Sequence, residues 1–181
     1  MEEMYADPTH AEETFDENNL SEYLLQAQWS EFVELKRAIT EVHQKTKRPL
    51  YVLDIGIGNA RVPKHLSGID EIWRMIQQYD GIDVAQNCVD ISKNLACTLH
   101  IDDKVSVKLL DATNLNQLGG SYDLIISTWF TAGNFFPFQF DFETFKSGYD
   151  MSRNEKFEAI FQQAYSKLNT GGEIMIPSVV R

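Results

Sequence analysis

Apolar residues follow two alternating patterns along the chain, short continuous runs and longer stretches at helical spacing. The short runs are rich in β-branched and aromatic residues, which is typical of buried strands. They occupy residues 49–55 (PLYVLDI), 80–85 (DGIDVA), 104–112 (KVSVKLLDA), 122–130 (YDLIISTWF) and 173–180 (EIMIPSVV). Helical spacing occupies 61–79, 86–101 and 152–172, and 113–121 is expected to be a short helix or a loop. This alternation predicts right-handed βαβ units around a parallel sheet.

The amino-terminal stretch from residue 20 to 42 has an amphipathic pattern that predicts one helix or a broken pair of helices, with Ser21 or Ser30 as the cap. Tyr23 and Trp29 lie on its apolar side, so we expect both in the core. Pro63 is compatible only with the first turn of the helix after the first strand.

The predicted helices also carry signals at their ends. Residues 61–79 place an apolar face on one side of a single helix, formed by Val62, Leu66, Ile69, Trp73 and Ile76. The segment 152–172 opens with Ser152 and Glu155 in capping-box spacing. It closes with Gly171 and Gly172, where a helix end needs a left-handed residue.

Length and composition fit one soluble globular domain. The chain has 181 residues, of which 43% are hydrophobic and 24% are charged. No apolar stretch is long enough to cross a bilayer, and the first residues are acidic rather than signal-like, so we expect a cytoplasmic protein without membrane contact. The expected organisation is an acidic mobile leader (1–19) and a main domain (20–181). That domain includes a helical cap (20–48) and an aromatic insertion (129–151).

The charge distribution argues against nucleic acid as a partner. The net charge is −11, but residues 1–22 hold eight acidic residues and no Lys or Arg, which leaves 19 acidic and 16 basic residues elsewhere. Neither part offers the basic stripe that phosphate contacts require. The spacing of Cys88 and Cys97 fits neither a zinc knuckle nor a redox pair, and the four histidines are scattered, so no metal site is expected.

The turn after the first strand, DIGIGNA (54–60), places Gly56 and Gly58 where the backbone can adopt positive φ and approach a ligand closely. The helix that follows is expected to present free N–H groups to an acceptor. Asp83 and Asp111 end the second and third strands, as expected for a nucleoside site. Arg61 stands where a dinucleotide fingerprint needs its third glycine, and no Walker motif is present. These features disfavour NAD, FAD and nucleoside triphosphates.

This ordered series resembles the class I S-adenosylmethionine-dependent methyltransferases over residues 49–180. The matching segments are VLDIGIGNA, with Ala60 where many members have glycine, then GIDVA, LLDAT, YDLIIST and LNTGGEIMI. The resemblance implies an α/β three-layer sandwich of the Rossmann-like type, with a parallel sheet in the order 3-2-1-4-5. It also implies S-adenosyl-L-methionine as the cofactor.

The resemblance assigns a role to each strand end. Gly56 and Gly58 would face the methionine portion of the cofactor, and Asp54 would orient the turn or the ammonium group. Asp83 would bind the ribose, and Asp111 would lie at the adenine. The full expected cofactor-binding set is Asp54, Gly56, Ile57, Gly58, Asp83, Val84, Asp111, Ala112 and Ser127.

The segment after the fourth strand is the expected acceptor side. Seven of the eleven phenylalanines fall between residues 130 and 145, either as a packed arm or as a substrate lining. The segment lacks the D/N-PPY motif of enzymes that methylate nucleobases or glutamine. TAGNFFP (131–137) is similar to the Gly-Asn segment of glycine and histidine N-methyltransferases. It suggests Asn134 as the residue that grips a substrate, with Tyr149, Asp141 and Glu143 as further candidates.

Three hypotheses follow, and the first is a methyltransferase of a small molecule such as an amine. The second is a non-catalytic S-adenosylmethionine-binding or interaction module, and the third, disfavoured by Arg61, is a nicotinamide-dependent oxidoreductase. The sequence ends soon after the fifth strand, whereas this family usually continues to strands six and seven. We therefore expect either a truncated chain or a homodimer that covers the apolar edge.

Overall fold

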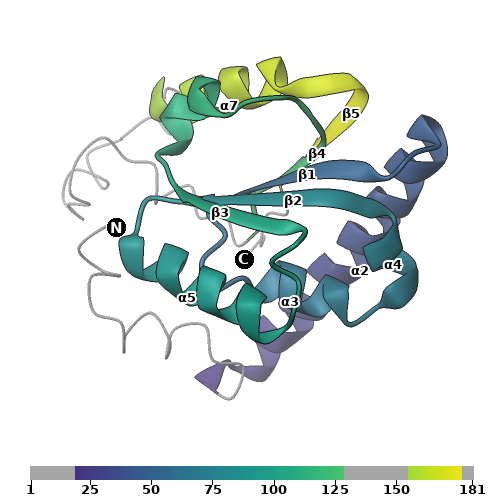
Figure 1. Ribbon diagram of the computed structural model, residues 1–181. Coiled ribbons are helices and arrows are strands. Elements are labelled where there is room, and N and C mark those ends of the chain that lie inside the picture. The colour runs from purple at the N-terminus through teal and green to yellow at the C-terminus, as the bar shows by residue number, and fades with distance from the viewer. Residues whose placement is uncertain (1–18, 129–154, 177–181) are drawn as a thin grey trace.

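The computed structural model describes residues 19–128 and 155–176, which form a parallel sheet with helices on both faces (Figure 1). The strands are β1 (Leu50–Ile55), β2 (Ile76–Asp83), β3 (Val105–Leu109), β4 (Tyr122–Ile126) and β5 (Leu168–Met175). Their order across the sheet is β3-β2-β1-β4-β5, and every neighbouring pair is parallel. The parallel sheet predicted from the alternation of elements and the strand order implied by the resemblance are both confirmed.

The helices form two layers, one on each face of the sheet (Figure 1). One layer contains α2 (Glu22–Thr46), α3 (Arg61–Ser67), α4 (Asp70–Arg74) and α5 (Gln86–Thr98), and the other contains η2 (Ala112–Gln117) and α7 (Glu155–Ser166). Two separate apolar clusters fill the spaces on either side of the sheet. The predicted three-layer sandwich is therefore confirmed for the described residues.

Helix α2 is continuous, which decides between the two predicted alternatives. Ser21 is its cap, and its Oγ accepts a hydrogen bond from Leu24 N at 3.3 Å. The expectation that Tyr23 and Trp29 lie in the core is wrong, because their side chains are 53% and 61% exposed. The core-facing stripe of α2 instead runs through Phe32, Leu35, Ala38, Ile39 and Val42.

The single helix predicted over 61–79 is wrong in its second half. The chain forms two short helices, α3 and α4, and then enters β2 at Ile76 rather than at Asp80. In residues 76–79, Ile76 and Tyr79 are buried and the two glutamines between them are more exposed. This stretch pairs with the start of β1. Pairing with a buried central strand therefore decided the conformation of a stretch whose spacing also fits a helix.

The predicted helix over 152–172 also ends early, since α7 stops at Ser166 and β5 begins at Leu168. Gly171 does have a positive φ of 82°, but it lies inside β5, where the register with β4 shifts. A Cβ on Gly172 would lie 3.0 Å from the carbonyl oxygens of Asn169 and Asp123. The two glycines thus serve an irregular strand start, not a helix cap.

The amino end of the sheet is held together by the buried carboxylate of Asp123 in β4. Arg48 donates to it twice, from Nη2 to Oδ1 at 2.7 Å and from Nη1 to Oδ2 at 2.9 Å. Asn169 Nδ2 donates to Oδ1 at 2.8 Å, and Tyr51 N donates to Oδ2 at 2.9 Å. One carboxylate therefore connects β1, β4, β5 and the segment after α2.

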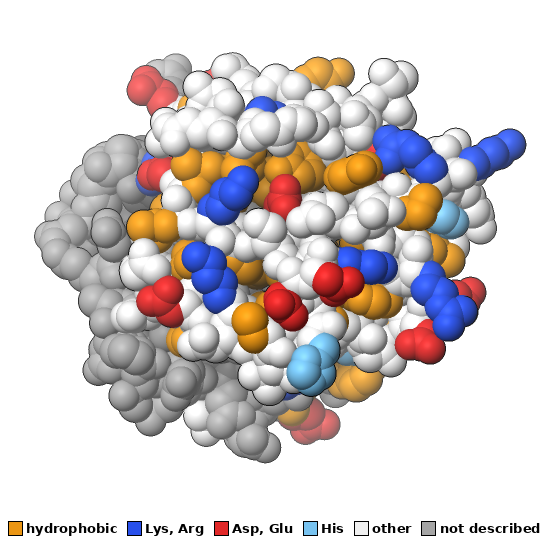
Figure 2. All heavy atoms as spheres, viewed as in Figure 1, with side chains coloured by type: hydrophobic (Ala, Val, Ile, Leu, Met, Phe, Trp, Pro, Cys, Tyr) orange, Lys and Arg blue, Asp and Glu red, His pale blue; other side chains and the backbone are white. Residues whose placement is uncertain are grey.

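The surface of the described part is mixed in charge on the face shown in Figure 2, where basic side chains are scattered among acidic ones. No helix among residues 19–128 and 155–176 is both long enough and apolar enough to span a membrane.

Candidate functional site at the carboxyl edge of the sheet

The turn between β1 and α3 is built from residues in the left-handed region. Gly56 has a φ of 80° and Gly58 a φ of 58°, as the sequence predicted. Ala60 also has a positive φ of 59°, at the position where the resemblance expects a third glycine. A Cβ on Gly56 would meet no atom within 4 Å, so the backbone at that position borders open space. The turn therefore leaves room for close approach of a ligand.

The backbone N–H groups of Gly56, Ile57 and Gly58 are occupied, and so is that of Arg61 at the start of α3, where a free N–H group was expected. Gly56 N and Ile57 N both donate to the carbonyl oxygen of Ile82, at 2.9 and 3.0 Å. Gly58 N donates to Asp83 Oδ2 at 3.0 Å, and Arg61 N donates to Asn59 Oδ1 at 3.2 Å. The turn is thus tied to the end of β2, and these donors are not available to a phosphate.

The side chain of Ile57 is buried against β2, so only its backbone can face the candidate site. Its exposed fraction is 5%, and a Cβ on Gly81 would lie 2.2 Å from Ile57 Cδ1. Gly81 is therefore required for the turn to pack on the sheet, a role that the sequence analysis missed. In the sequence, this role of Gly81 was indicated only by its position as a lone glycine inside a predicted strand.

Asp54 is the most buried acid of the site, with 1% of its surface exposed. The hydroxyl of Tyr79 in β2 donates to Asp54 Oδ2 at 2.6 Å, whereas Oδ1 has no hydrogen-bond partner among the described residues. Burial raises the pKa of Asp54 to about 7, although the hydrogen bond from Tyr79 and the charge of Arg61 oppose this rise. The carboxyl group therefore titrates near neutral pH.

A buried ion pair lies beside this carboxylate. Arg61 Nη2 donates to Glu31 Oε1 of α2 at 2.7 Å, and both side chains are at least 90% buried. The guanidinium also lies 5.0 Å from the ring centroid of Phe32. In the sequence, Arg61 was recognisable only as a missing glycine, and Glu31 and Tyr79 were not recognisable because nothing in their local sequence distinguishes them.

Asp83 closes β2 and is tied to the backbone on both sides. Its Oδ2 accepts from Gly58 N at 3.0 Å, and its Oδ1 accepts from Ala85 N at 2.9 Å. Burial raises the pKa of Asp83, and these backbone hydrogen bonds oppose the rise. The neighbouring Val84 leaves 37% of its surface exposed at the same edge.

Asp111 caps η2 at the end of β3. Its Oδ1 accepts from Thr113 N and Thr113 Oγ1, both at 2.9 Å, and Lys156 Nζ lies 3.5 Å from Oδ2. Partial burial alone would raise the pKa of Asp111, but these hydrogen bonds and the Lys156 charge outweigh it, so the pKa is lowered. Ala112 beside it is 6% exposed.

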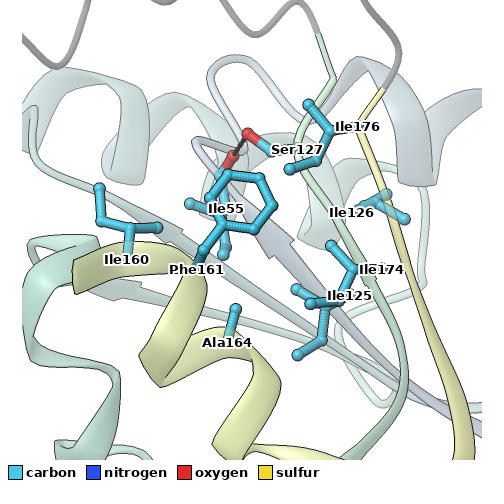
Figure 3. A pocket seen from close by; sticks show the side chains of 9 residues that line it. All are labelled: Ile55, Ile125, Ile126, Ser127, Ile160, Phe161, Ala164, Ile174 and Ile176. Carbon is cyan, nitrogen blue, oxygen red and sulfur yellow. Dashed lines mark hydrogen bonds between the residues drawn. The ribbon is translucent and has the colours of Figure 1, made fainter. Parts of the chain in front are cut away.

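Ser127 follows β4 and joins the strand ends. Its Oγ donates to the carbonyl oxygen of Ile55 at 2.8 Å, and its N–H donates to the carbonyl oxygen of Met175 at 3.2 Å. It borders an apolar pocket between α7 and the sheet (Figure 3). The pocket is lined by Ile55, Ile125, Ile126, Ser127, Ile160, Phe161, Ala164, Ile174 and Ile176. The hydroxyl of Ser127 is already bonded, so the surface that this pocket offers is apolar.

All nine expected cofactor-binding residues therefore lie at or beside the carboxyl edge of the sheet. The expected acceptor residues Asn134, Asp141, Glu143 and Tyr149 lie outside the described residues. Among the residues that are described, no group of three or more His, Cys, Asp or Glu side chains is arranged to hold a metal ion.

No protein-family model matches the chain. Solved structures with a similar fold include a S-adenosylmethionine-dependent methyltransferase from Clostridium acetobutylicum. It is 14% identical with a TM-score of 0.57, over 93% of this chain and 55% of that one. The O-MT of StiE is 16% identical with a TM-score of 0.53, over 79% of this chain and 42% of that one.

A precorrin 8w decarboxylase from Methanobacterium thermoautotrophicum is also similar. It is 16% identical with a TM-score of 0.51, over 74% of this chain and 56% of that one. The chain spans about half the length of these three proteins. Their names cover more than one reaction, so the likeness establishes architecture and not activity. The chain has the Rossmann-like fold of the class I S-adenosylmethionine-dependent methyltransferases.

Proposed function

We propose that the chain binds S-adenosylmethionine at the carboxyl edge of its sheet and transfers the methyl group to a small-molecule acceptor such as an amine. The motif series from Asp54 to Ser127 and the strand order β3-β2-β1-β4-β5 support this proposal together. Neither alone would suffice, because the motifs are short and the fold hosts several reactions.

The observation that carries the proposal is the contrast between Asp54 and the glycine turn beside it. Asp54 Oδ1 is a buried acceptor without a partner in the described part of the chain, whereas the N–H groups of Gly56, Ile57 and Gly58 are occupied. Such a site suits a ligand that brings a positive charge and no phosphate. S-adenosylmethionine meets both conditions, whereas a nicotinamide dinucleotide carries two phosphates and fails the second.

The remaining residues fit the nucleoside. A carboxylate has about four lone-pair sites, so Asp83 keeps acceptor capacity for ribose hydroxyls beyond its two bonds to Gly58 N and Ala85 N. Open space at Gly56 and the exposed side chain of Val84 offer a surface against which flat or apolar groups can lie. Asp111 and Ala112 stand at the next strand end, where the adenine would bind.

When bound, the cofactor would supply a methyl group already activated on a sulfonium. The chain would then need to align donor and acceptor and to exclude water rather than to provide a nucleophile. For the acceptor we propose Asn134 and Tyr149 as the residues that hold it. On the face shown in Figure 2 the basic side chains are scattered among acidic ones, which supports a small molecule over nucleic acid as the partner of that face.

The test is calorimetric titration with S-adenosylmethionine and S-adenosylhomocysteine. We expect micromolar binding by the natural chain and by Asp90→Asn, which removes an exposed carboxylate of α5, and at least tenfold weaker binding by Asp54→Asn. Release of S-adenosylhomocysteine with a panel of amines would then establish transfer. Binding without turnover would favour the non-catalytic module, and absence of binding by folded protein would contradict the proposal.

A further inference from the structure

Two buried side-chain atoms, one in β1 and one in α2, have no hydrogen-bond partner in the described part of the chain. One is the acceptor Asp54 Oδ1, and the other is the donor Gln28 Nε2 of α2. Their side chains belong to residues that are 1% and 4% exposed. Burying a polar atom without a partner is unfavourable, so a pair of them on one side of a site needs an explanation.

Both atoms belong to the layer between the sheet and α2. Asp54 shares its face of β1 with Val52, whose partner in β2 is Tyr79, and both of these pack in the cluster beneath α2. Gln28 lies three residues before Glu31 on α2, so the two side chains share one helix face.

Glu31 links this helix face to the turn. It accepts from Arg61 Nη2 at 2.7 Å, and Arg61 is the first residue of α3. The charges of both Arg61 and Glu31 act on the pKa of Asp54, which places the ion pair close to the carboxylate. Gln28 shares the helix face of Glu31 and therefore lies on the side of α2 that faces this ion pair.

The two unpartnered atoms are chemically complementary to one kind of group. Asp54 Oδ1 offers an acceptor that carries negative charge when ionised, and Gln28 Nε2 offers a neutral donor. The negative charges of Glu31 and Asp83 and the positive charge of Arg61 all act on Asp54, and the acidic groups outnumber the basic one, so a cation is favoured. A zwitterionic α-amino acid group supplies an ammonium for the carboxylate and a carboxylate for the amide.

We propose that Gln28 binds the carboxylate of the ligand's amino-acid end while Asp54 binds its ammonium, so that α2 forms the amino-acid wall of the site. This inference rests on the proposed function, because it names the part of S-adenosylmethionine that α2 holds. It assigns a binding role to a residue outside the motif series.

The test compares S-adenosylhomocysteine with methylthioadenosine, which has the same nucleoside and thioether but lacks the amino-acid group. Gln28→Leu keeps the size of the side chain and removes the donor. We expect it to weaken S-adenosylhomocysteine binding about tenfold or more and to leave methylthioadenosine binding unchanged. The matched control is Gln26→Leu, an exposed position on the same helix, which should change neither affinity.

Ligand-free stability separates a binding role from a structural one. Removing a buried amide donor that has no partner should raise the Tm of the ligand-free chain, by about 2 °C or more. A lowered Tm together with equal losses for both ligands would show that Gln28 is structural and would overturn the inference. Unchanged affinity for S-adenosylhomocysteine would overturn it too, and failure of the natural chain to bind either ligand would refute the proposed function itself.

Discussion

Asp123 and Asp54 are both buried carboxylates in neighbouring strands, one near each end of the sheet, and their surroundings differ sharply. Asp123 accepts four hydrogen bonds, two on each oxygen. Asp54 accepts one, from Tyr79, and its other oxygen has no partner among the described residues. The amino edge is therefore satisfied by the protein itself, whereas the carboxyl edge retains a capacity that a ligand can use.

This difference separates a buried carboxylate that stabilises the fold from one that can bind a ligand. A saturated buried carboxylate holds segments together, and removing it leaves several donors without an acceptor. A partly satisfied one lowers stability in the absence of ligand and gains its partner on binding. Substitutions at the two positions should therefore act in opposite directions.

The largest effect is expected for Asp123→Ala. The change deprives Arg48, Asn169 and the N–H of Tyr51 of their acceptor, and should lower the free energy of unfolding by about 3 kcal/mol. Arg48 is 45% exposed and can turn to water, which limits the loss. Denaturant unfolding measures it, with Asp103→Ala at an exposed position as the control. An effect equal to that of the control would show that the network contributes little.

The opposite sign is expected for Asp54→Asn. The pKa of Asp54 is raised to about 7 by burial, so the folded state binds this proton more tightly than the unfolded chain. The contribution of the carboxyl group to stability is therefore full below its ordinary pKa and is lost as the pH rises toward 7.

Asparagine cannot ionise, so Asp54→Asn should gain about 2 kcal/mol over the natural chain at pH 8 and little at pH 4. Thermal unfolding across this pH range measures the difference, and the gain should come with loss of cofactor binding. A variant that is less stable at pH 8 would contradict the view that Asp54 is retained for a ligand.

The sequence predicted the strand-end residues well because each motif is contiguous. Asp54, Gly56 and Asp83 could be placed at one sheet edge once the alternation of elements was recognised, since carboxyl ends of parallel strands meet there. The start of β2 could not be predicted, because the spacing of residues 76–79 fits a helix until pairing with β1 is known.

The partners of the two carboxylates were beyond sequence reasoning for a different reason. The donors to Asp123 come from segments 46 to 75 residues away, and Gln28 reaches the site only because α2 packs across the sheet. Contacts between distant segments depend on packing, which the local pattern does not record. The residues missed at the site, including Glu31 and Tyr79, are of this kind.

Gly81→Ala tests how the turn depends on β2 and should have an intermediate effect. Its Cβ would lie 2.2 Å from Ile57 Cδ1, so the buried isoleucine must move and the turn with it. We expect a loss of between about 1 and 2 kcal/mol in stability and weaker cofactor binding. Gly119→Ala is the matched control, because its Cβ would meet no atom within 4 Å. Normal binding by Gly81→Ala would show that the turn adapts.

The smallest change in stability, about 1 kcal/mol, is expected for Tyr79→Phe, which removes the one donor to Asp54 and little else. That hydrogen bond lowers the pKa of Asp54, so its loss should raise the pKa above 7. If the ionised carboxylate binds the ammonium, affinity for S-adenosylhomocysteine rises with pH through about 7 in the natural chain.

In Tyr79→Phe this rise should therefore move to higher pH, while the affinity for methylthioadenosine stays independent of pH over the same range. Calorimetry between pH 6 and 9 measures both curves, and Tyr165→Phe, at a position 75% exposed on α7, is the control. A curve that keeps its midpoint would mean that the Tyr79 hydroxyl does not set the ionisation of Asp54. Its role would then be limited to packing, and the comparison with Asp123 would rest on the vacant oxygen alone.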